Sequence, residues 1–141
     1  MVTDESVFRL LFLTLLALPA APAATAILNA IADQPSARVL QVEFRAASAE
    51  GWKVSSAKLM LHVASGPVPT QVRIAAAGSK AYRSYKPEPQ PEGWVRIAVD
   101  PKLIEAMAAG KTKGLAIQQG KTRFHGLDPA FTQPYILIEG Q

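Results

Sequence analysis

The chain contains no cysteine among its 141 residues. This absence excludes disulfide bonds, thiolate metal ligands, a cysteine nucleophile and the lipidated cysteine of a bacterial lipoprotein. The net charge is only +4, and the basic residues are scattered. No run of lysine and arginine therefore indicates nucleic-acid binding. A mildly basic surface would suit acidic polymers, although it also fits ordinary solubility.

The sequence also lacks the motifs of common catalytic classes. It has no G-x-S-x-G motif, and the Gly-Lys-Thr triplets at 110–112 and 120–122 lack the first glycine of a phosphate-binding loop, which predicts turns. His125 and Asp128 would supply only two metal ligands on one loop. His62 falls on the polar side of its segment and is expected to be solvated. We predict no enzymatic activity, no cofactor and no metal site.

Residues 1–26 are typical of a secretory signal peptide. Leu10–Leu18 is an apolar run of suitable length, and Ala24–Ala26 forms an A-x-A cleavage site. Two acidic residues accompany the single Arg9 at the start, where a positive excess is usual, so retention as a membrane anchor is an alternative. Cleavage predicts an extracytoplasmic protein (periplasmic, secreted or on the cell surface) with no remaining membrane span.

The rest of the chain favours one all-β domain at 38–140. Residues 27–37 are small, polar and aperiodic, which favours a short lead-in. Apolar and polar residues then alternate as they do in half-buried strands. The expected strands are Val39–Arg45, Lys53–Val63, Thr70–Ala75, Trp94–Val99, Leu115–Ile117 and Pro134–Ile138. Short strands separated by turn residues favour an antiparallel β-sandwich.

Two further segments have local signatures. Asp100 is well placed as a helix N-cap, with Pro101 at the first helical position and Gly110 just past the end, which predicts one short helix. Gly78–Glu92 contains prolines at every second position from Pro87, and these would remove hydrogen-bond donors from a central strand. An exposed loop of extended character is expected there, either as a binding surface or as a rigid connector.

Three stretches resemble the DNRLRE-type β-sandwich domains. ARVLQVEFRAASAEGWKVSSAKLMLHV resembles their opening, GWVRIAVDPKLIEAMAAGKTKGLAIQQGK their later half, and FHGLDPAFTQPYILIEG their close. The resemblance covers most of Arg38–Gly140. It implies a jelly-roll-like sandwich related in shape to the carbohydrate-binding modules of extracellular bacterial proteins, some of which are thought to bind polysaccharide. The chain departs from the family in its missing or degenerate first strand and in having no catalytic partner domain.

Aromatic side chains are the leading candidates for a binding site, because flat rings stack on sugars. The tentative ligand-binding residues are Trp94, Tyr82, Arg83, Tyr85 and Trp52. Each also fits a structural role, such as covering an edge of the sandwich. We expect a non-catalytic polysaccharide-binding module. The alternative is a structural or protein-interaction module of the cell envelope, and a truncated relic of a larger domain is a third possibility.

Overall fold

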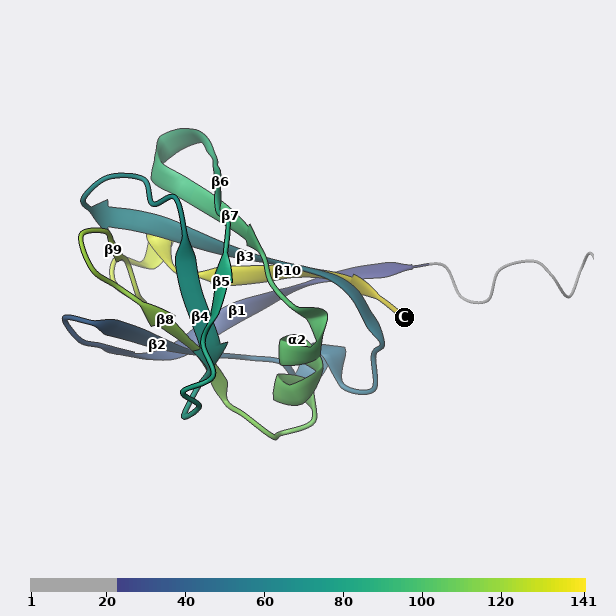
Figure 1. Ribbon diagram of the computed structural model, residues 1–141. Helices are drawn as coiled ribbons and strands as arrows, with labels where there is room; N and C mark the ends of the chain where they lie inside the picture. The colour runs from purple at the N-terminus through teal and green to yellow at the C-terminus, as the bar shows by residue number, and fades with distance from the viewer. Residues whose placement is uncertain (1–22) are drawn as a thin grey trace, which may run out of the picture.

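The computed structural model describes residues 23–141. The strands of this part form one strongly curled antiparallel sheet in the order β5-β4-β8-β2-β1-β10-β3-β7-β6, and β9 pairs with the end of β3 (Figure 1). For residues 23–141, a mostly β architecture with one short α-helix is therefore confirmed, as one curled sheet rather than two clearly separate sheets. No helix of residues 23–141 is long and apolar enough to cross a membrane. The signal peptide predicted at 1–26 lies almost wholly outside the described residues.

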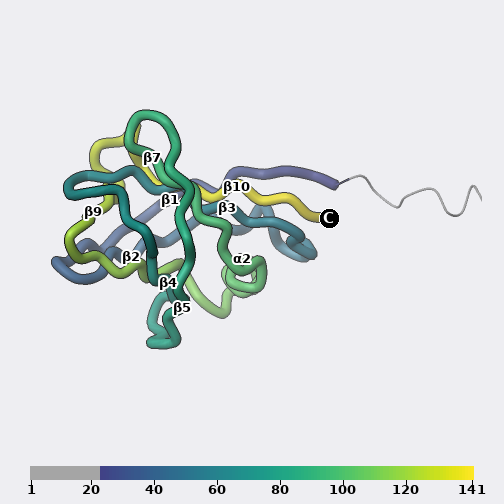
Figure 2. Tube along the Cα trace, turned by 45° about the horizontal axis from the view of Figure 1, so that its top comes forward, coloured from purple at the N-terminus to yellow at the C-terminus, as the bar shows by residue number. Residues whose placement is uncertain are grey.

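The strands and the helix have the following bounds. The strands are β1 (Ala24–Pro35), β2 (Val39–Phe44), β3 (Val54–Ser65), β4 (Val72–Ala76), β5 (Arg83–Tyr85), β6 (Glu88–Pro89), β7 (Trp94–Ala98), β8 (Gly114–Gln118), β9 (Arg123–Phe124) and β10 (Tyr135–Gly140); the helix is α2 (Pro101–Ala108). Single 3-10 turns occupy Ala47–Ala49, Pro91–Gly93 and Ala130–Thr132. Figure 2 shows the same chain path from a second direction.

Strand β1 corrects the prediction of a lead-in at 27–37. Residues 24–29 of β1 pair with β10, and residues 30–35 pair with β2 after a register shift between Ala30 and Ala32. Such a bulge lets one strand serve two differently directed parts of a sheet. A strand ahead of Arg38 therefore lies at the centre of the sheet. A cut after Ala26 would remove three residues that pair with β10.

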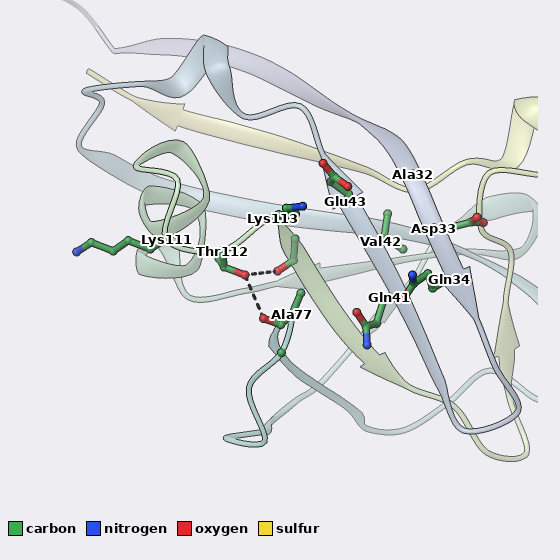
Figure 3. Close-up of a pocket in the computed structure, with 12 residues that line it drawn as sticks. Ala32, Asp33, Gln34, Gln41, Val42, Glu43, Ala77, Lys111, Thr112 and Lys113 are labelled. Carbon is green, nitrogen blue, oxygen red and sulfur yellow. Dashed lines mark hydrogen bonds between the residues drawn. The ribbon is translucent and has the colours of Figure 1, made fainter.

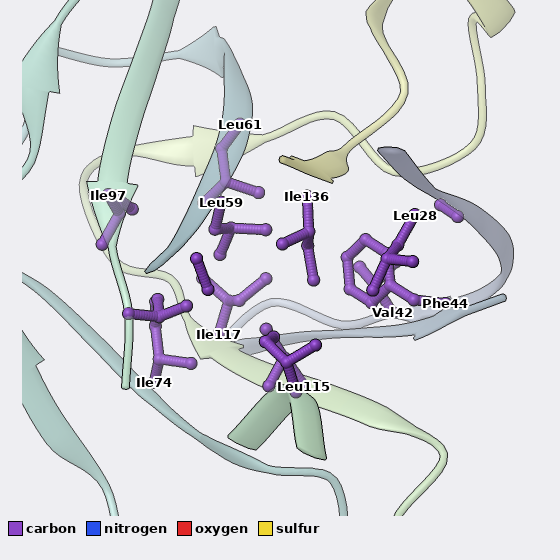
Figure 4. Packing of buried hydrophobic residues seen from close by; sticks show 14 of the residues in the cluster. Leu28, Val42, Phe44, Leu59, Leu61, Ile74, Ile97, Leu115, Ile117 and Ile136 are labelled. Atoms are coloured by element: carbon purple, nitrogen blue, oxygen red, sulfur yellow. The ribbon is translucent and has the colours of Figure 1, made fainter. Parts of the chain in front are cut away.

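The other predicted strands correspond to β2, β3, β4, β7, β8 and β10. Their alternating apolar residues point into one core, where Leu28, Phe44, Leu59, Ile117 and Ile136 converge from β1, β2, β3, β8 and β10 (Figure 4). Met60 lies on the outer side of β3 and is nevertheless buried. The proline-rich loop contains the short strands β5 and β6, which form the two opposite edges of the sheet. Pro89 belongs to β6, and a missing N–H is tolerated in an edge strand.

Helix α2 follows the predicted capping signals. The side chain of Asp100 accepts a hydrogen bond from the Lys102 N–H at 3.0 Å, and Pro101 begins the helix. Ile104 and Met107 are buried against the core. On the other side of the helix, Glu105 accepts a 2.8 Å bond from the Val54 N–H, which ties the start of β3 to α2.

Candidate functional site

The five residues predicted as a binding site lie in three separate places. Trp94 begins β7, while Tyr82, Arg83 and Tyr85 lie in and beside the edge strand β5. Trp52 precedes β3, and its ring packs half-buried against the core, as expected of a residue that covers an edge. The sequence-predicted residues therefore do not form one shared surface, and each group has its own surroundings.

Trp94 belongs to an aromatic cluster on the outer face of β3, β7 and β10. Its ring makes edge contacts with His62 and Tyr135, with centroids 5.1 and 5.5 Å apart. On the same face, Arg96 pairs with Glu88 at 2.8 Å. This hydrogen bond lowers the pKa of the exposed Glu88 carboxyl. Trp94 is half-buried here, so its ring offers only part of its area to a ligand.

The residues at β5 are held by cation contacts. Arg83 forms a 3.1 Å ion pair with Asp100 and lies over the Tyr85 ring, which packs against the core. Tyr82 instead faces Arg73 of β4, whose guanidinium carbon lies 5.9 Å from the centre of the Tyr82 ring. Both contacts have the geometry of cation–π pairs. None of the five predicted residues lines one of the three hollows described below, but Tyr82 contacts Arg73, which does.

This groove has a volume of about 600 Å³ and lies between residues 67–73 and 118–124. We call it the β4–β9 groove. Its two walls are joined by a hydrogen bond from Thr122 Oγ1 to the Pro67 carbonyl. Gly66 permits their close approach, because it has a φ of 90° and a Cβ there would lie 2.0 Å from the Lys121 carbonyl oxygen. The groove is therefore a product of packing between segments distant in sequence.

The polar lining of the β4–β9 groove is cationic. Arg73 and Lys121 line it, and among the described residues that do so there is no aspartate or glutamate. Neither cation forms an ion pair with another described residue. Gln71 accepts a bond from Ser84 at 3.1 Å, which leaves its NH₂ group for a ligand. The apolar surface comes from Val68, Pro69, Val72 and Phe124.

Two other hollows differ in their charge. The hollow in Figure 3, of about 510 Å³, is lined by strands β1, β2 and β8, and its basic Lys111 and Lys113 are balanced by Asp33 and Glu43. Thr112 in its wall bonds to the carbonyls of Ala77 and Gly114. The third, of about 650 Å³, lies on the outer face of β1, β3 and β10. It contains Lys58, Arg96 and Glu139, and Arg96 is paired with Glu88 at 2.8 Å, so this hollow has no comparable excess of unpaired charge.

A histidine pair that the sequence does not reveal lies beside the Trp94 cluster. The prediction that His62 is simply solvated is wrong. Its Nδ1 lies 2.9 Å from Nδ1 of His125, and its Nε2 lies 2.9 Å from the Glu92 carbonyl oxygen. Desolvation, and then the charge of His62, lower the pKa of His125, while Asp128 acts in the opposite direction. Among residues 23–141 no three metal-binding side chains of the His, Cys, Asp or Glu type cluster together.

Lys121 and Thr122 are groove residues that the sequence does not identify. They belong to the second Gly-Lys-Thr triplet, for which the sequence predicts only a turn. The available signal is a turn rich in polar residues close to the end of a predicted strand. Comparison of the chain with known protein families and with curated proteins finds no match.

Proposed function

We propose that the chain is an exported, non-catalytic polysaccharide-binding module and that the β4–β9 groove holds the sugar chain. The observation that carries this proposal is a groove that combines two cations, amide side chains and apolar residues and has no acidic residue in its lining. Ligand sites commonly combine an apolar lining with a few polar groups that fix orientation. The resemblance to DNRLRE-type domains adds support from the sequence.

The chemistry of the groove fits sugars that carry carboxylate or sulfate groups. A guanidinium pairs with such a group through two parallel hydrogen bonds, and Arg73 is already oriented by the Tyr82 ring. Amide side chains such as Gln71 and Gln118 both donate and accept, which suits sugar hydroxyls. The Tyr82 ring contacts Arg73 but does not itself line the groove.

We propose further that the curled sheet is a variant of the jelly-roll-like sandwich of DNRLRE-type domains. The strand that opens on Trp94, the short helix α2 and strand β8 follow one another in the order that the resemblance implies. The export of the protein rests on the signal-peptide features of residues 1–26.

Calorimetric titration of the purified protein with polygalacturonate and with a neutral polysaccharide tests the proposed function. Polygalacturonate should bind, and Arg73→Ala should weaken its binding about 10- to 150-fold, because a charge-assisted hydrogen bond contributes about 1.5–3 kcal/mol. Arg45→Ala is the matched control, because it removes the same charge away from the groove. The groove residue Gln118 pairs with Val39 at one end of β2, whereas Arg45 follows the other end, where Glu43 pairs with Gly114. Equal losses in both variants, or no binding to any polysaccharide, would contradict the proposal.

A protein-interaction module of the cell envelope is the second candidate function. Ile27 and Leu137 are directly paired across β1 and β10, and their side chains are 57% and 37% exposed on the outer face. Paired exposed apolar residues favour a contact with another protein. A photo-crosslinking residue placed at position 27 in the native host should then give a discrete protein adduct, while one at position 45 should not.

A further inference from the structure

The histidine pair joins two segments far apart in the chain. His62 lies in β3, and His125 follows β9, whose two residues pair with the end of β3. The backbone N–H of His125 donates to the His62 carbonyl at 2.9 Å, beside the ring contact. The ring centroids are 5.0 Å apart against 2.9 Å for the Nδ1 atoms, so these nitrogens are the nearest points of the two rings and face one another.

The hydrogen-bond partners determine which nitrogen carries the proton. The Glu92 carbonyl oxygen can only accept, so Nε2 of His62 carries a hydrogen and donates to it. Nδ1 of neutral His62 is then an acceptor, and the hydrogen between the rings belongs to His125. The position of Glu92 is itself enforced: its φ is 61°, and Gly93 beside it lies so close to His62 that a Cβ would be 3.1 Å from Nε2.

This arrangement tolerates one added proton but not two. A first proton can go to Nε2 of His125, which leaves the bond between the Nδ1 atoms in place and makes it charge-assisted. A second proton must go to Nδ1 of His62, the acceptor of that bond. The bond is then lost, and two cationic rings face each other with their nitrogens 2.9 Å apart.

The charges around the pair come from several elements. Glu92 lies in the 3-10 turn before β7, Asp128 follows His125 in its own loop, and Arg123 precedes it in β9. Tyr135 of β10 contacts Trp94, while Arg96 of β7 is engaged by Glu88. A second tether holds the same loop, because Asp33 of β1 accepts a 2.8 Å bond from the Leu127 N–H.

We propose that His62 and His125 form a proton-operated latch, which holds residues 123–127 against β3 while at least one ring is neutral and releases them when both rings are protonated. Phe124, the neighbour of His125, lines the β4–β9 groove together with Lys121. Release of the latch therefore loosens one wall of the groove and weakens binding there at acidic pH. That last step rests on the proposed function, whereas the latch itself does not.

The latch is tested by nuclear magnetic resonance on the purified protein without a ligand. These are the chain's only two histidines, so their ring Cε1–H signals can be followed from pH 8 to pH 4.5 and assigned with one variant. We expect two macroscopic protonation steps that belong to the pair rather than to either ring. Hydrogen-exchange protection of the His125 amide should fall about tenfold or more with the second step only. A tenfold change in protection corresponds to the free energy of one pKa unit. The Leu59 amide, in the middle of β3, is the internal control.

His125→Gln is the matched variant, because a glutamine amide can donate to neutral His62 or accept from protonated His62. It should keep its loop protection at pH 5. Independent titration of the two rings in the unaltered protein, or unchanged His125 protection through both steps, would overturn the latch. The unaltered protein alone decides the matter if the variant does not fold. A latch that operates in a protein that binds no polysaccharide would refute the proposed function but leave the latch standing.

Discussion

At the scale of single residues, charge without a partner is the informative feature of the molecule. Arg83 and Arg96 each have an acidic neighbour, at 3.1 and 2.8 Å, and these exposed pairs contribute little to stability. Arg73 has the Tyr82 ring instead, and Lys121 has no acidic neighbour among the described residues. Their location in one groove is what distinguishes the β4–β9 groove from the two hollows of balanced charge.

The close approach at Gly66 gives a prediction at this scale. Gly66→Ala should destabilise the fold by about 1–3 kcal/mol, because the new Cβ would clash with the Lys121 carbonyl and the positive φ disfavours a side chain. The free energy of unfolding, measured with urea, checks this. Gly120→Ala is the control in the opposite wall, where a Cβ meets no atom within 4 Å. Equal stability of the two variants would show that the walls are not in contact.

Residue-scale signals were predictable where they were local. Asp100 and Pro101 mark the helix because a cap acts on its own first turn. The groove and the histidine pair were not predictable, because each joins segments that approach only through sheet pairing. His62 and His125 are 63 positions apart, and nothing in either neighbourhood indicates the other.

At the scale of elements, β1 is the long strand that the sequence pattern does not predict, and the short strands β5, β6 and β9 are also not predicted. Burial along β1 does not follow the size of its apolar side chains. Leu28 and the small Ala30 are buried, whereas Ile27 and Ile31 are 57% and 42% exposed. Large apolar residues on both faces, mixed with alanine and asparagine, hide a period of two. β2 and β3 were predicted because their outer faces are mostly polar. Met60 of β3 is the exception, since neighbouring side chains on the outer face cover it.

The role of β1 can be tested with adjacent substitutions. Leu28→Ala should lower the free energy of unfolding by about 2–5 kcal/mol, because it leaves a cavity at a fully buried position. Ile27→Ala, on the opposite face of the same strand, should cost less than about 1 kcal/mol. Denaturant unfolding of both variants checks this. A lead-in segment without a place in the core would give small losses at both positions.

At the scale of the whole molecule, ionisation couples stability to pH in two windows. The pKa of His125 is lowered in the folded protein, so the unfolded chain binds more protons as the pH falls through its ordinary value of 6.5. Stability from this group is complete above that pH and is lost as the pH falls toward the lowered pKa. The lowered pKa of Glu88 acts separately, below its ordinary value of 4.5.

Urea unfolding between pH 8 and pH 4.8 therefore has a predicted form. The midpoint should be level at the alkaline end and should fall once the pH drops below about 6.5. His125→Gln should flatten this fall, because the coupled second charge is gone. Arg96→Gln, which removes the cation beside Glu88, should leave it unchanged. A midpoint that rises on acidification would contradict the assigned direction of the His125 shift.

Amide shift mapping with a short oligogalacturonate shows whether the β4–β9 groove holds a polysaccharide. Saturable chemical-shift changes are expected at the amides of Gln71, Arg73, Gln118 and Lys121, with little change at Ile27 and Leu137 on the outer face. Changes confined to the outer face would contradict binding in the groove. So would the absence of any change at ligand concentrations well above the dissociation constant of a weak complex.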